Sequence, residues 1–312
     1  MKASIIMPTY NRANVLSKSL DTCFAQTLPL NEYEVILVDN NSLDNTLDIA
    51  EIYQKKYSNF RYIKELKAGA THARHTGAKN AQSDILVFVD DDGLFNPSLL
   101  EEILKVYETN SSVVAVTGKI DLLWDAPKPD WIEPYEFMLA KLDYGNEIKF
   151  GYDLYLNGLL FSINKNIFEN LKGFNPDYIG GYLIGDGDTG LVDKLHKNKY
   201  LIGYTPYALV QHMQSVAVHG SVKDLGRRFY NVGISSSYAI FRKNNFHFSY
   251  EIAKYLLKSG IFLIKKWVEM NLWKDDRKKY FSYMQRKGEL RFFFYLFDES
   301  LKKEILSTDY TN

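Results

Sequence analysis

The sequence has a single cysteine, no long apolar run and no excess of charge of one sign, and each of these absences excludes some classes of protein. Cys23 cannot form an internal disulfide, which fits a reducing compartment, and on a helix face between Leu20 and Phe24 we expect it to be a small core residue. No apolar run approaches the roughly 18 residues that a membrane-spanning helix requires, and the first residues lack a secretory-signal pattern. Lys+Arg and Asp+Glu each number 38, so whole-chain charge does not favour nucleic acid. We therefore expect a cytoplasmic protein, either free or peripheral at the inner face of the membrane.

Three carboxylates follow an apolar strand in the stretch Asp84 to Gly93, which reads D-I-L-V-F-V-D-D-D-G. Ile85 to Val89 has the pattern of a strand buried on both faces, as in a parallel sheet. Asp90 to Asp92 then lie at its carboxyl end, where open α/β sheets bind ligands. Adjacent carboxylates repel one another, and a bound divalent cation usually offsets this repulsion. Asp90 and Asp92 point the same way on an extended backbone and could share one ion. The alternative is an acidic turn in solvent.

Strand and helix patterns alternate from the first residue to about Ile120, which predicts an α/β fold with a mostly parallel, doubly wound sheet and helices on both faces. Asn11 is the expected N-cap of the first helix. Asp121 to Gly151 has no clear period and is predicted to be a shaped surface loop. The last two strands are expected at Tyr200 to Gly203 and Ala208 to Val210. Beyond Ser221 the chain is predicted to be helical, so we divide it into a domain at 1–220 and a helical C-terminal extension at 221–312.

Polar residues follow several of these strands, and the carboxyl ends of parallel strands share one edge of a sheet. We therefore expect Tyr10, Asp39, the acidic triplet and His212 to converge on one crevice. Asp39 suits a ribose hydroxyl or a base N–H, and Tyr10 could stack on a base. A metal held by the triplet would then bind a diphosphate. Tyr10 as a surface turn residue and His212 as a structural histidine stay open.

Four blocks stand in order along the first third of the chain: S-I-I-M-P-T-Y-N-R, V-I-L-V-D-N-N-S-L-D-N-T, A-G-A-T-H-A-R-H-T-G-A and V-F-V-D-D-D-G. Together they resemble the successive blocks of family 2 glycosyltransferases. Order and spacing match from about Ala3 to Pro97, and weaker blocks continue to about Gly233. The resemblance implies the GT-A fold and an inverting, nucleotide-sugar-dependent enzyme, with the nucleotide sugar in about 1–120 and the acceptor in about 121–220.

The resemblance also implies a role for each matching residue. Asp39, Thr9 and Tyr10 would hold the base and ribose, Arg74 the base or diphosphate, and Asp91 would face the donor sugar. The implied nucleotide-sugar-binding residues are Pro8, Thr9, Tyr10, Arg12, Asp39, Asp44, Arg74, Asp90 and Asp91. The implied ligands of Mn²⁺ or Mg²⁺ are Asp90, Asp92 and His212. On spacing alone, Arg74 is as easily a helix-surface ion-pair partner.

The acceptor-side block of the family is a Gly followed by Glu-Asp at the start of a helix. This sequence departs from that block at one position. The match is Gly185-Asp186-Gly187-Asp188, so Gly187 occupies the glutamate position. Asp188 would be the general base that takes the proton of the acceptor hydroxyl, and Asp186 could stand in. An aspartate at a helix start is also commonly an N-cap.

The tail from Phe246 onward is basic, with 13 Lys+Arg against 9 Asp+Glu. Tyr250 to Met270 predicts an amphipathic helix, whose stripe includes Ile252, Trp267 and Val268 beside lysines such as Lys266. With the aromatic cluster Arg291 to Phe297 it could lie on an anionic membrane surface through residues 250–297. Equally, the stripe could pack on the catalytic domain or on a second copy in a homo-oligomer.

We conclude from the sequence that the chain transfers a sugar from a nucleotide sugar, with a UDP-sugar as the expected donor, to a hydroxyl of a glycan or lipid-linked acceptor by metal-assisted direct displacement. The partners are then the donor and that acceptor, and no nucleic acid. Two alternatives remain. A binding module of the same fold without turnover is favoured by Gly187. A nucleotidyltransferase would need a Gly-rich basic loop after the first strand, which Pro8 to Arg12 does not provide.

Overall fold

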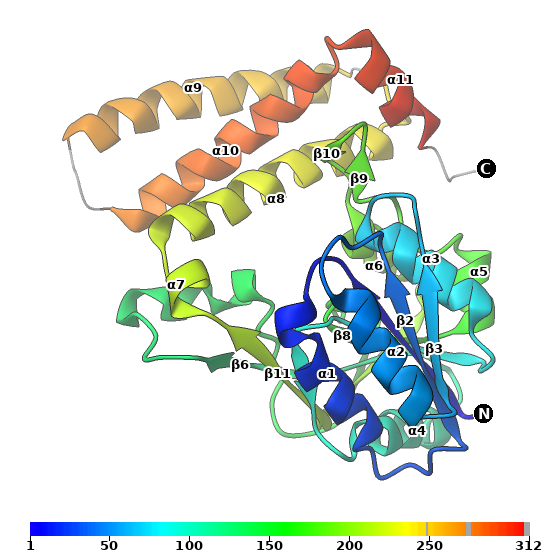
Figure 1. The fold of residues 1–312 in the computed structure, drawn as a ribbon. Coiled ribbons are helices and arrows are strands. Elements are labelled where there is room, and N and C mark those ends of the chain that lie inside the picture. The colour runs from blue at the N-terminus through cyan, green and yellow to red at the C-terminus, as the bar shows by residue number, and fades with distance from the viewer. Residues whose placement is uncertain (248, 273–275, 309–312) are drawn as a thin grey trace. The chain divides into compact units, whose positions relative to one another are not determined.

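The computed structural model describes residues 1–247, 249–272 and 276–308, which pack as two compact units (Figure 1). The first comprises Met1–Asp125, Pro134–Phe174 and Asp188–Gln214; the second comprises Ala126–Glu133, Asn175–Gly187 and Ser215–Asn312. Three segments that the division at residue 220 assigns to the first domain, Ala126–Glu133, Asn175–Gly187 and residues 215–220, thus pack with the helical one. Trp131 lies against Phe281 with ring centroids 6.3 Å apart, which ties one of these segments to a C-terminal helix.

The first unit is built on a nine-stranded sheet in the order β3-β2-β1-β4-β8-β6-β11-β5, with β7 also paired to β11. β8 runs antiparallel between β4 and β6, so β3, β2, β1, β4, β6 and β11 all point the same way. The mostly parallel sheet predicted from the alternating pattern is therefore confirmed. The strands are β1 (Ala3–Thr9), β2 (Tyr33–Asp39), β3 (Phe60–Lys64), β4 (Ile85–Val89), β5 (Gly93–Phe95), β6 (Val113–Trp124), β7 (Lys149–Gly151), β8 (Leu160–Asn164) and β11 (Leu201–Gln214).

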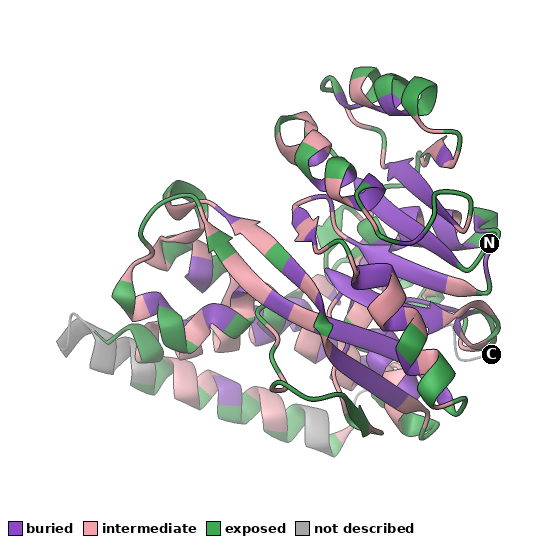
Figure 2. Cartoon of the chain, turned by 90° about the horizontal axis from the view of Figure 1, so that it is seen from below, coloured by how far each residue is buried: buried purple, intermediate pink, exposed green. Residues whose placement is uncertain are grey.

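Helices cover both faces of this sheet because its central strands are apolar on both sides (Figure 2). In β1, Ile5 and Met7 pack with α1 (Ala13–Phe24), α2 (Thr46–Lys56) and α4 (Leu99–Thr109). The intervening Ile6 packs with α3 (Ala70–Asn80), α5 (Lys165–Asn170) and α6 (Gly187–Lys197). Cys23 is buried in the first of these cores, as expected.

Three local predictions were wrong. The segment Asp121 to Gly151 is not a loop throughout, because it contains the end of β6, a 3₁₀ helix at Asp130–Leu139 and β7. The last two strands are one strand, β11, whose pairing with β6 shifts register between Thr205 and Leu209. Pro206 lies in this irregularity, where its missing N–H interrupts the ladder without ending the strand. His212 therefore lies inside β11 and not after it. The first helix is preceded by Arg12, and Asn11 is not its N-cap because it adopts a left-handed backbone with φ of 52°.

The second unit is mainly helical, as predicted for the C-terminal region. It holds the hairpin of β9 (Tyr178–Ile179) and β10 (Tyr182–Leu183), then α7 (Val216–His219), α8 (Val222–Lys243), α9 (Tyr250–Leu272), α10 (Arg277–Tyr295) and α11 (Glu299–Ser307). The 3₁₀ helix η1 (Asp130–Leu139) begins in this unit. α8 and α10 cross closely at Gly233 and Gly288, where a Cβ would overlap a backbone carbonyl of the other helix. Of the described helices, none has the length and apolar character to cross a membrane.

Candidate active site

The loop after β4 holds the acidic triplet, and its middle carboxylate is internal. Asp91 is 7% exposed and accepts a hydrogen bond from the Thr9 hydroxyl at 2.6 Å, which ties the loop to the end of β1. The Ser19 hydroxyl of α1 donates to the Asp91 carbonyl at 2.7 Å. Burial raises the pKa of Asp91 to about 7. Thr9 and Ser19 thus fix the position of the loop through Asp91, whose Oδ1 also lies 3.8 Å from Arg12 Nε.

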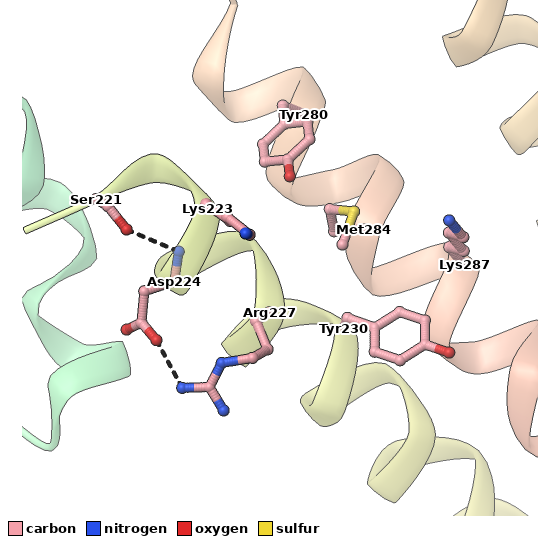
Figure 3. Close-up of a pocket in the computed structure, with 8 residues that line it drawn as sticks. All are labelled: Ser221, Lys223, Asp224, Arg227, Tyr230, Tyr280, Met284 and Lys287. Carbon is pink, nitrogen blue, oxygen red and sulfur yellow. Dashed lines mark hydrogen bonds and ion pairs between the residues drawn. The ribbon is translucent and has the colours of Figure 1, made fainter. Parts of the chain in front are cut away.

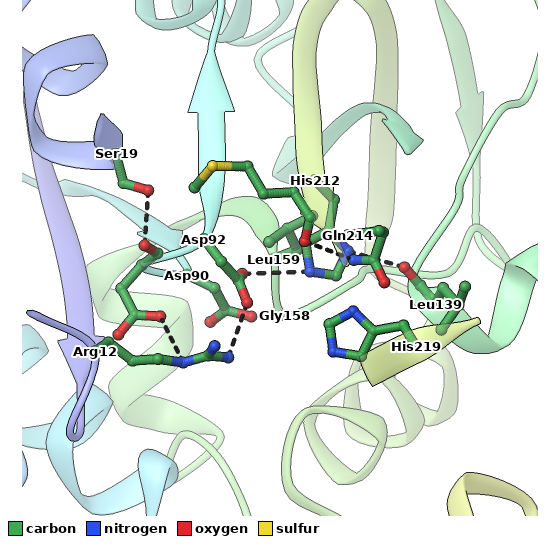
Figure 4. Close-up of polar contacts among 12 residues, drawn as sticks. Arg12, Ser19, Asp90, Asp92, Leu139, Gly158, Leu159, His212, Gln214 and His219 are labelled. Carbon is green, nitrogen blue, oxygen red and sulfur yellow. Dashed lines mark hydrogen bonds and ion pairs between the residues drawn. The ribbon is translucent and has the colours of Figure 1, made fainter. Parts of the chain in front are cut away.

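Asp92 lies between a cation and an imidazole (Figure 4). Its Oδ2 accepts from Arg12 Nη2 at 3.0 Å, and its Oδ1 lies 3.3 Å from His212 Nε2. His212 arrives there because β11 pairs antiparallel with β5, which sets it opposite Gly93. Burial alone would lower the His212 pKa, but the Asp92 carboxylate outweighs it and the pKa is raised.

Asp90 begins a chain of contacts that ends at Asp188. Arg74 Nη2 donates to Asp90 Oδ1 at 2.6 Å and to the Gly158 carbonyl at 3.2 Å. The Gly158 N–H in turn donates to Asp188 Oδ2 at 3.0 Å. Arg74 is only 7% exposed, so it is an internal residue of α3 and the helix-surface alternative is wrong. The sheet edge therefore brings the proposed base next to the arginine and the acidic triplet.

A side chain at residue 158 would press on the ends of the Asp188 and Arg74 side chains. A Cβ at residue 158 would lie 2.7 Å from Asp188 Oδ2 and 3.0 Å from Arg74 Nη2. Gly158 follows a stretch without period, so sequence reasoning did not single it out. Ser19 escaped notice for a similar reason, because a serine among the apolar positions of a helix carries no signal of its own.

The residues predicted to hold the nucleoside lie after β1 and β2. Asp39 is 2% exposed, and its two oxygens accept from the Ser42 N–H and from the Tyr62 hydroxyl, each at 2.8 Å. Tyr62, on β3, was not anticipated from the sequence. Tyr10 is 55% exposed, so its ring is open to a ligand. Pro8 lies within β1.

The loops after β1 and β2 are joined to one another by side chains. Asp44 Oδ2 accepts from the Ala13 N–H at 3.0 Å, and its Oδ1 accepts from the Thr46 N–H at 3.1 Å. Asn11 donates its N–H to the Ser42 hydroxyl at 2.9 Å, and its own side-chain oxygen accepts from the Leu43 N–H. Asp44 therefore accepts hydrogen bonds at the starts of both α1 and α2.

The chemistry of the donor set near Asp92 fits a divalent cation. His212 Nδ1 lies 2.9 Å from the Leu139 carbonyl, and in the neutral ring that donates to this oxygen Nε2 carries the lone pair that a metal ligand needs. Within the described ranges no three Asp, Glu, His or Cys side chains yet converge at metal-binding distance. The Arg12 and Arg74 guanidiniums neutralise Asp92 and Asp90 in this arrangement.

Asp186, the second candidate base, lies in the second unit, and both of its carboxylate oxygens accept hydrogen bonds from neighbouring side chains. Its Oδ1 accepts from Asn175 Nδ2 at 2.8 Å, and its Oδ2 accepts from Arg242 Nη2 at 2.7 Å. The Asp186 side chain is 1% exposed and that of Arg242 11%. This is a buried ion pair that holds the segment before α6 to α8.

Comparison with known proteins agrees with the architecture. The mannosyltransferase PcManGT from Pyrobaculum calidifontis, solved with GDP-Man and Mn²⁺, has a TM-score of 0.55 and 20% identity over 75% of this chain and 62% of its own. TarS of Staphylococcus aureus has a TM-score of 0.52 and 18% identity over 80% of this chain and 44% of its own. The fold is thus the predicted GT-A fold.

Among curated proteins, the chain is 34% identical over 122 residues to the poly(ribitol-phosphate) beta-glucosyltransferase of Bacillus spizizenii, covering 38% of this chain and 19% of that one. It is 32% identical over 113 residues to the poly(ribitol-phosphate) beta-N-acetylglucosaminyltransferase TarP of Staphylococcus aureus, covering 36% and 34%. The chain thus matches about a third or less of the length of these two relatives. The family model described as "Glycosyl transferase family 2" matches residues 4–168, more than half of the sequence. The chain belongs to glycosyl transferase family 2.

Proposed function

We propose that this chain is an inverting glycosyltransferase that moves a sugar from a nucleoside diphosphate sugar to a hydroxyl group of a glycan or polyol-phosphate acceptor. The observation that carries the proposal is the line of contacts from Asp90 through Arg74 and Gly158 to Asp188. It sets a group suited to a leaving diphosphate beside a group suited to an incoming hydroxyl. Family membership and the printed names of the relatives support the same class of reaction.

In this proposal the acceptor oxygen attacks the anomeric carbon while the bond from that carbon to the diphosphate oxygen breaks. Asp188 takes the proton of the acceptor hydroxyl, and Arg74 stabilises the negative charge that develops on the leaving diphosphate. Attack opposite the leaving group inverts the anomeric centre, and no covalent enzyme intermediate is needed. Mn²⁺ or Mg²⁺, held by Asp92, Asp90 and His212, would add positive charge at the diphosphate.

Asp188 suits the base role better than Asp186 does. The two Asp188 oxygens accept from backbone N–H groups of Gly158 and Thr189, and each keeps lone-pair capacity for a substrate proton. Asp186 would have to give up a buried ion pair with Arg242 before it could act. Gly187, the departure from the family block, has φ of 40°, a conformation that glutamate adopts only with strain. Its presence therefore has a backbone reason apart from any loss of turnover, which weakens the binding-module alternative.

At the donor end, Thr9 and Asp91 are proposed as positioning residues that orient Asp90 and Asp92, and Asp91 need not touch the sugar. Tyr10 is proposed to stack on the base and Asp39 to receive a base or ribose group, with UDP as the expected nucleotide. Arg12, which pairs with Asp92, is proposed to move to the diphosphate when donor and metal bind.

The test is the release of nucleoside diphosphate from a panel of nucleotide sugars, with Mn²⁺ and with or without acceptor. We expect release that depends on both acceptor and metal, and an Asp92→Asn variant that loses Mn²⁺-dependent UDP binding by calorimetry while its melting temperature stays nearly unchanged. Donor binding without release under any acceptor would favour the binding module. Undiminished UDP binding by Asp92→Asn would remove that residue from the metal site.

Contact with a membrane surface is proposed through α9. One side of this helix packs inward through Tyr255 and Leu256, while Leu257, Ile261 and Ile264 are 66%, 59% and 68% exposed. The side chains of Ile252, Lys266, Trp267 and Val268, which belonged to the predicted stripe, lie outside the described residues. Cosedimentation of the full chain with anionic vesicles tests this. We expect a Leu257→Gln/Ile261→Gln variant to stay in the supernatant, and equal pelleting of both forms would contradict the idea.

A further inference from the structure

A groove that the proposed reaction does not use runs between α8 and α10 in the second unit (Figure 3). It consists of two cavities of about 520 and 400 Å³ that share Tyr230 and Lys287 among their lining residues, so they are neighbours along the same pair of helices. Both are lined by cations and by aromatic rings, which together suit a sugar-phosphate ligand.

Four exposed cations line this α8–α10 groove as two pairs, each spaced four residues apart on its helix. Lys223 and Arg227 lie on α8, and Lys287 and Arg291 lie on α10. Arg227 also pairs with Asp224, and Arg291 lies over the Tyr295 ring at 4.8 Å. Like charges at the four-residue spacing nevertheless destabilise a helix slightly, so the spacing itself adds nothing to helix stability. Four residues advance a helix by about 6 Å, so a ligand with repeated negative charges finds successive partners.

The acidic side chain in the lining, Asp224, offsets only part of this charge. Asp224 accepts from Arg227 Nη2 at 2.6 Å and from Arg228 Nε at 3.0 Å, and its side chain is only 10% exposed. Burial would raise the Asp224 pKa, but the two arginines outweigh it and the pKa is lowered, so the carboxylate remains an internal partner of α8. The groove surface therefore keeps an excess of positive charge.

The aromatic rings line the same space. Tyr280 packs over Gly226, which has no side chain to displace it, and Tyr230 lines both cavities. Phe294 is 60% exposed in the second cavity. Flat rings beside cations offer apolar contact for carbon-bound hydrogens and charge for phosphates, a combination that ligand sites use for orientation.

We propose that the α8–α10 groove binds the phosphodiester backbone of an anionic polyol-phosphate polymer, which is the acceptor of the transfer reaction. The inference rests on the proposed function in so far as it names the polymer as the acceptor. The choice of an anionic polymer as the ligand rests on charge complementarity with the groove. Two cation pairs on facing helices match a chain of repeated phosphates better than a single charged group. Holding the polymer on the enzyme raises its effective concentration for transfer.

The test compares Lys223→Gln/Lys287→Gln with a matched control, Lys254→Gln/Lys258→Gln, which removes two lysines of α9 that do not line the groove. The probe is purified poly(ribitol phosphate), with binding followed by affinity electrophoresis at low and at raised salt. We expect the groove variant to bind the polymer at least about tenfold more weakly, since hydrogen bonds to charged groups contribute that much. The control should bind within about twofold of wild type, and wild-type binding should weaken with salt.

Melting temperatures check that both variants fold, and vesicles of phosphatidylglycerol supply the alternative source of phosphate. Equal polymer binding by wild type and the groove variant overturns the proposal, as does wild-type binding to vesicles but not to polymer. Release of nucleoside diphosphate with a small sugar acceptor is measured in parallel and should be unchanged in the groove variant. Polymer binding without any transfer would refute the proposed function but not the proposed groove. Transfer without polymer binding would refute the proposed groove but not the proposed function.

Discussion

Exchanging the two aspartates that flank Gly187 for asparagine separates a chemical role from a structural one. Asp188→Asn keeps one side-chain oxygen that can still accept from the Gly158 N–H and loses the exposed bond from the Thr189 N–H, so most of the local geometry should survive. It removes the basic carboxylate, and loss of a general base lowers turnover by about 10²- to 10⁴-fold. That corresponds to roughly 3 to 5 kcal/mol of transition-state free energy. Donor binding and melting temperature should stay at wild-type values.

Asp186→Asn should have the opposite signature. The variant keeps an oxygen for Asn175 but removes the carboxylate charge that pairs with the Arg242 guanidinium, whose side chain is 11% exposed. Breaking a buried ion pair in this way costs about 3 to 5 kcal/mol of unfolding free energy. For a domain of this size the melting temperature should fall by roughly 10 °C.

The assay is transfer of a radiolabelled sugar under single-turnover conditions, with circular dichroism melts on the same preparations. The reasoning is refuted if Asp186→Asn stops transfer without lowering the melting temperature while Asp188→Asn turns over normally. In that event the base would be Asp186, and the contact line through Gly158 would have no part in proton removal.

Three further substitutions test other parts of the structure. Gly158→Ala should fold normally, because the atom it meets is the mobile end of Asp188, yet displacing that carboxylate should lower kcat by about 10²-fold in a transfer assay. Asp143→Asn should lower the unfolding free energy by less than about 1 kcal/mol at neutral pH, because its carboxylate is paired with Lys119 at 2.8 Å but 37% exposed. Because the pKa of Asp143 is lowered in the folded protein, its contribution to stability is present at pH values above the unfolded-state pKa and is lost as the pH falls through the folded-state pKa. Wild type and variant should therefore have the same melting temperature in strong acid. A difference in melting temperature that stays constant with pH would contradict this. Gly233→Ala should destabilise the second unit in urea unfolding, since a methyl group there would meet the backbone of α10, and an unchanged midpoint would speak against that crossing.

The strands and most helices could be predicted because each is marked by a pattern of neighbouring residues in the sequence. The apolar strand before Asp90 and the block order along the first third of the chain are short-range patterns, and both strand positions and fold followed from them. His212 could be named but not placed, because its position inside β11 depends on an antiparallel partner 119 residues earlier, Gly93.

Other parts of the site have no local signature. Gly158 matters through its backbone N–H and carbonyl, which every residue type shares, and Tyr62 reaches Asp39 only because β3 pairs with β2 in one particular register. Asp186 and Asp188 are two residues apart and both lie at a helix start, so spacing could not separate them. Their partners, Arg242 and Gly158, come from distant segments, and the proposed roles of the two aspartates rest on these partners.

The hydrogen bonds that join the loops after β1 and β2 bear on how a nucleotide would be received. Asp44 and Asn11 fasten the two loops to one another through the Ala13 and Leu43 backbone amides, so one wall of the proposed nucleoside pocket is already assembled in the free protein. A donor that enters there would lose little conformational entropy in ordering that wall. The cost of rearrangement would fall at the diphosphate end, where Arg12 is proposed to change partners. Nucleoside recognition would then be rigid and diphosphate recognition adaptive, two halves of one pocket that respond differently to the same ligand.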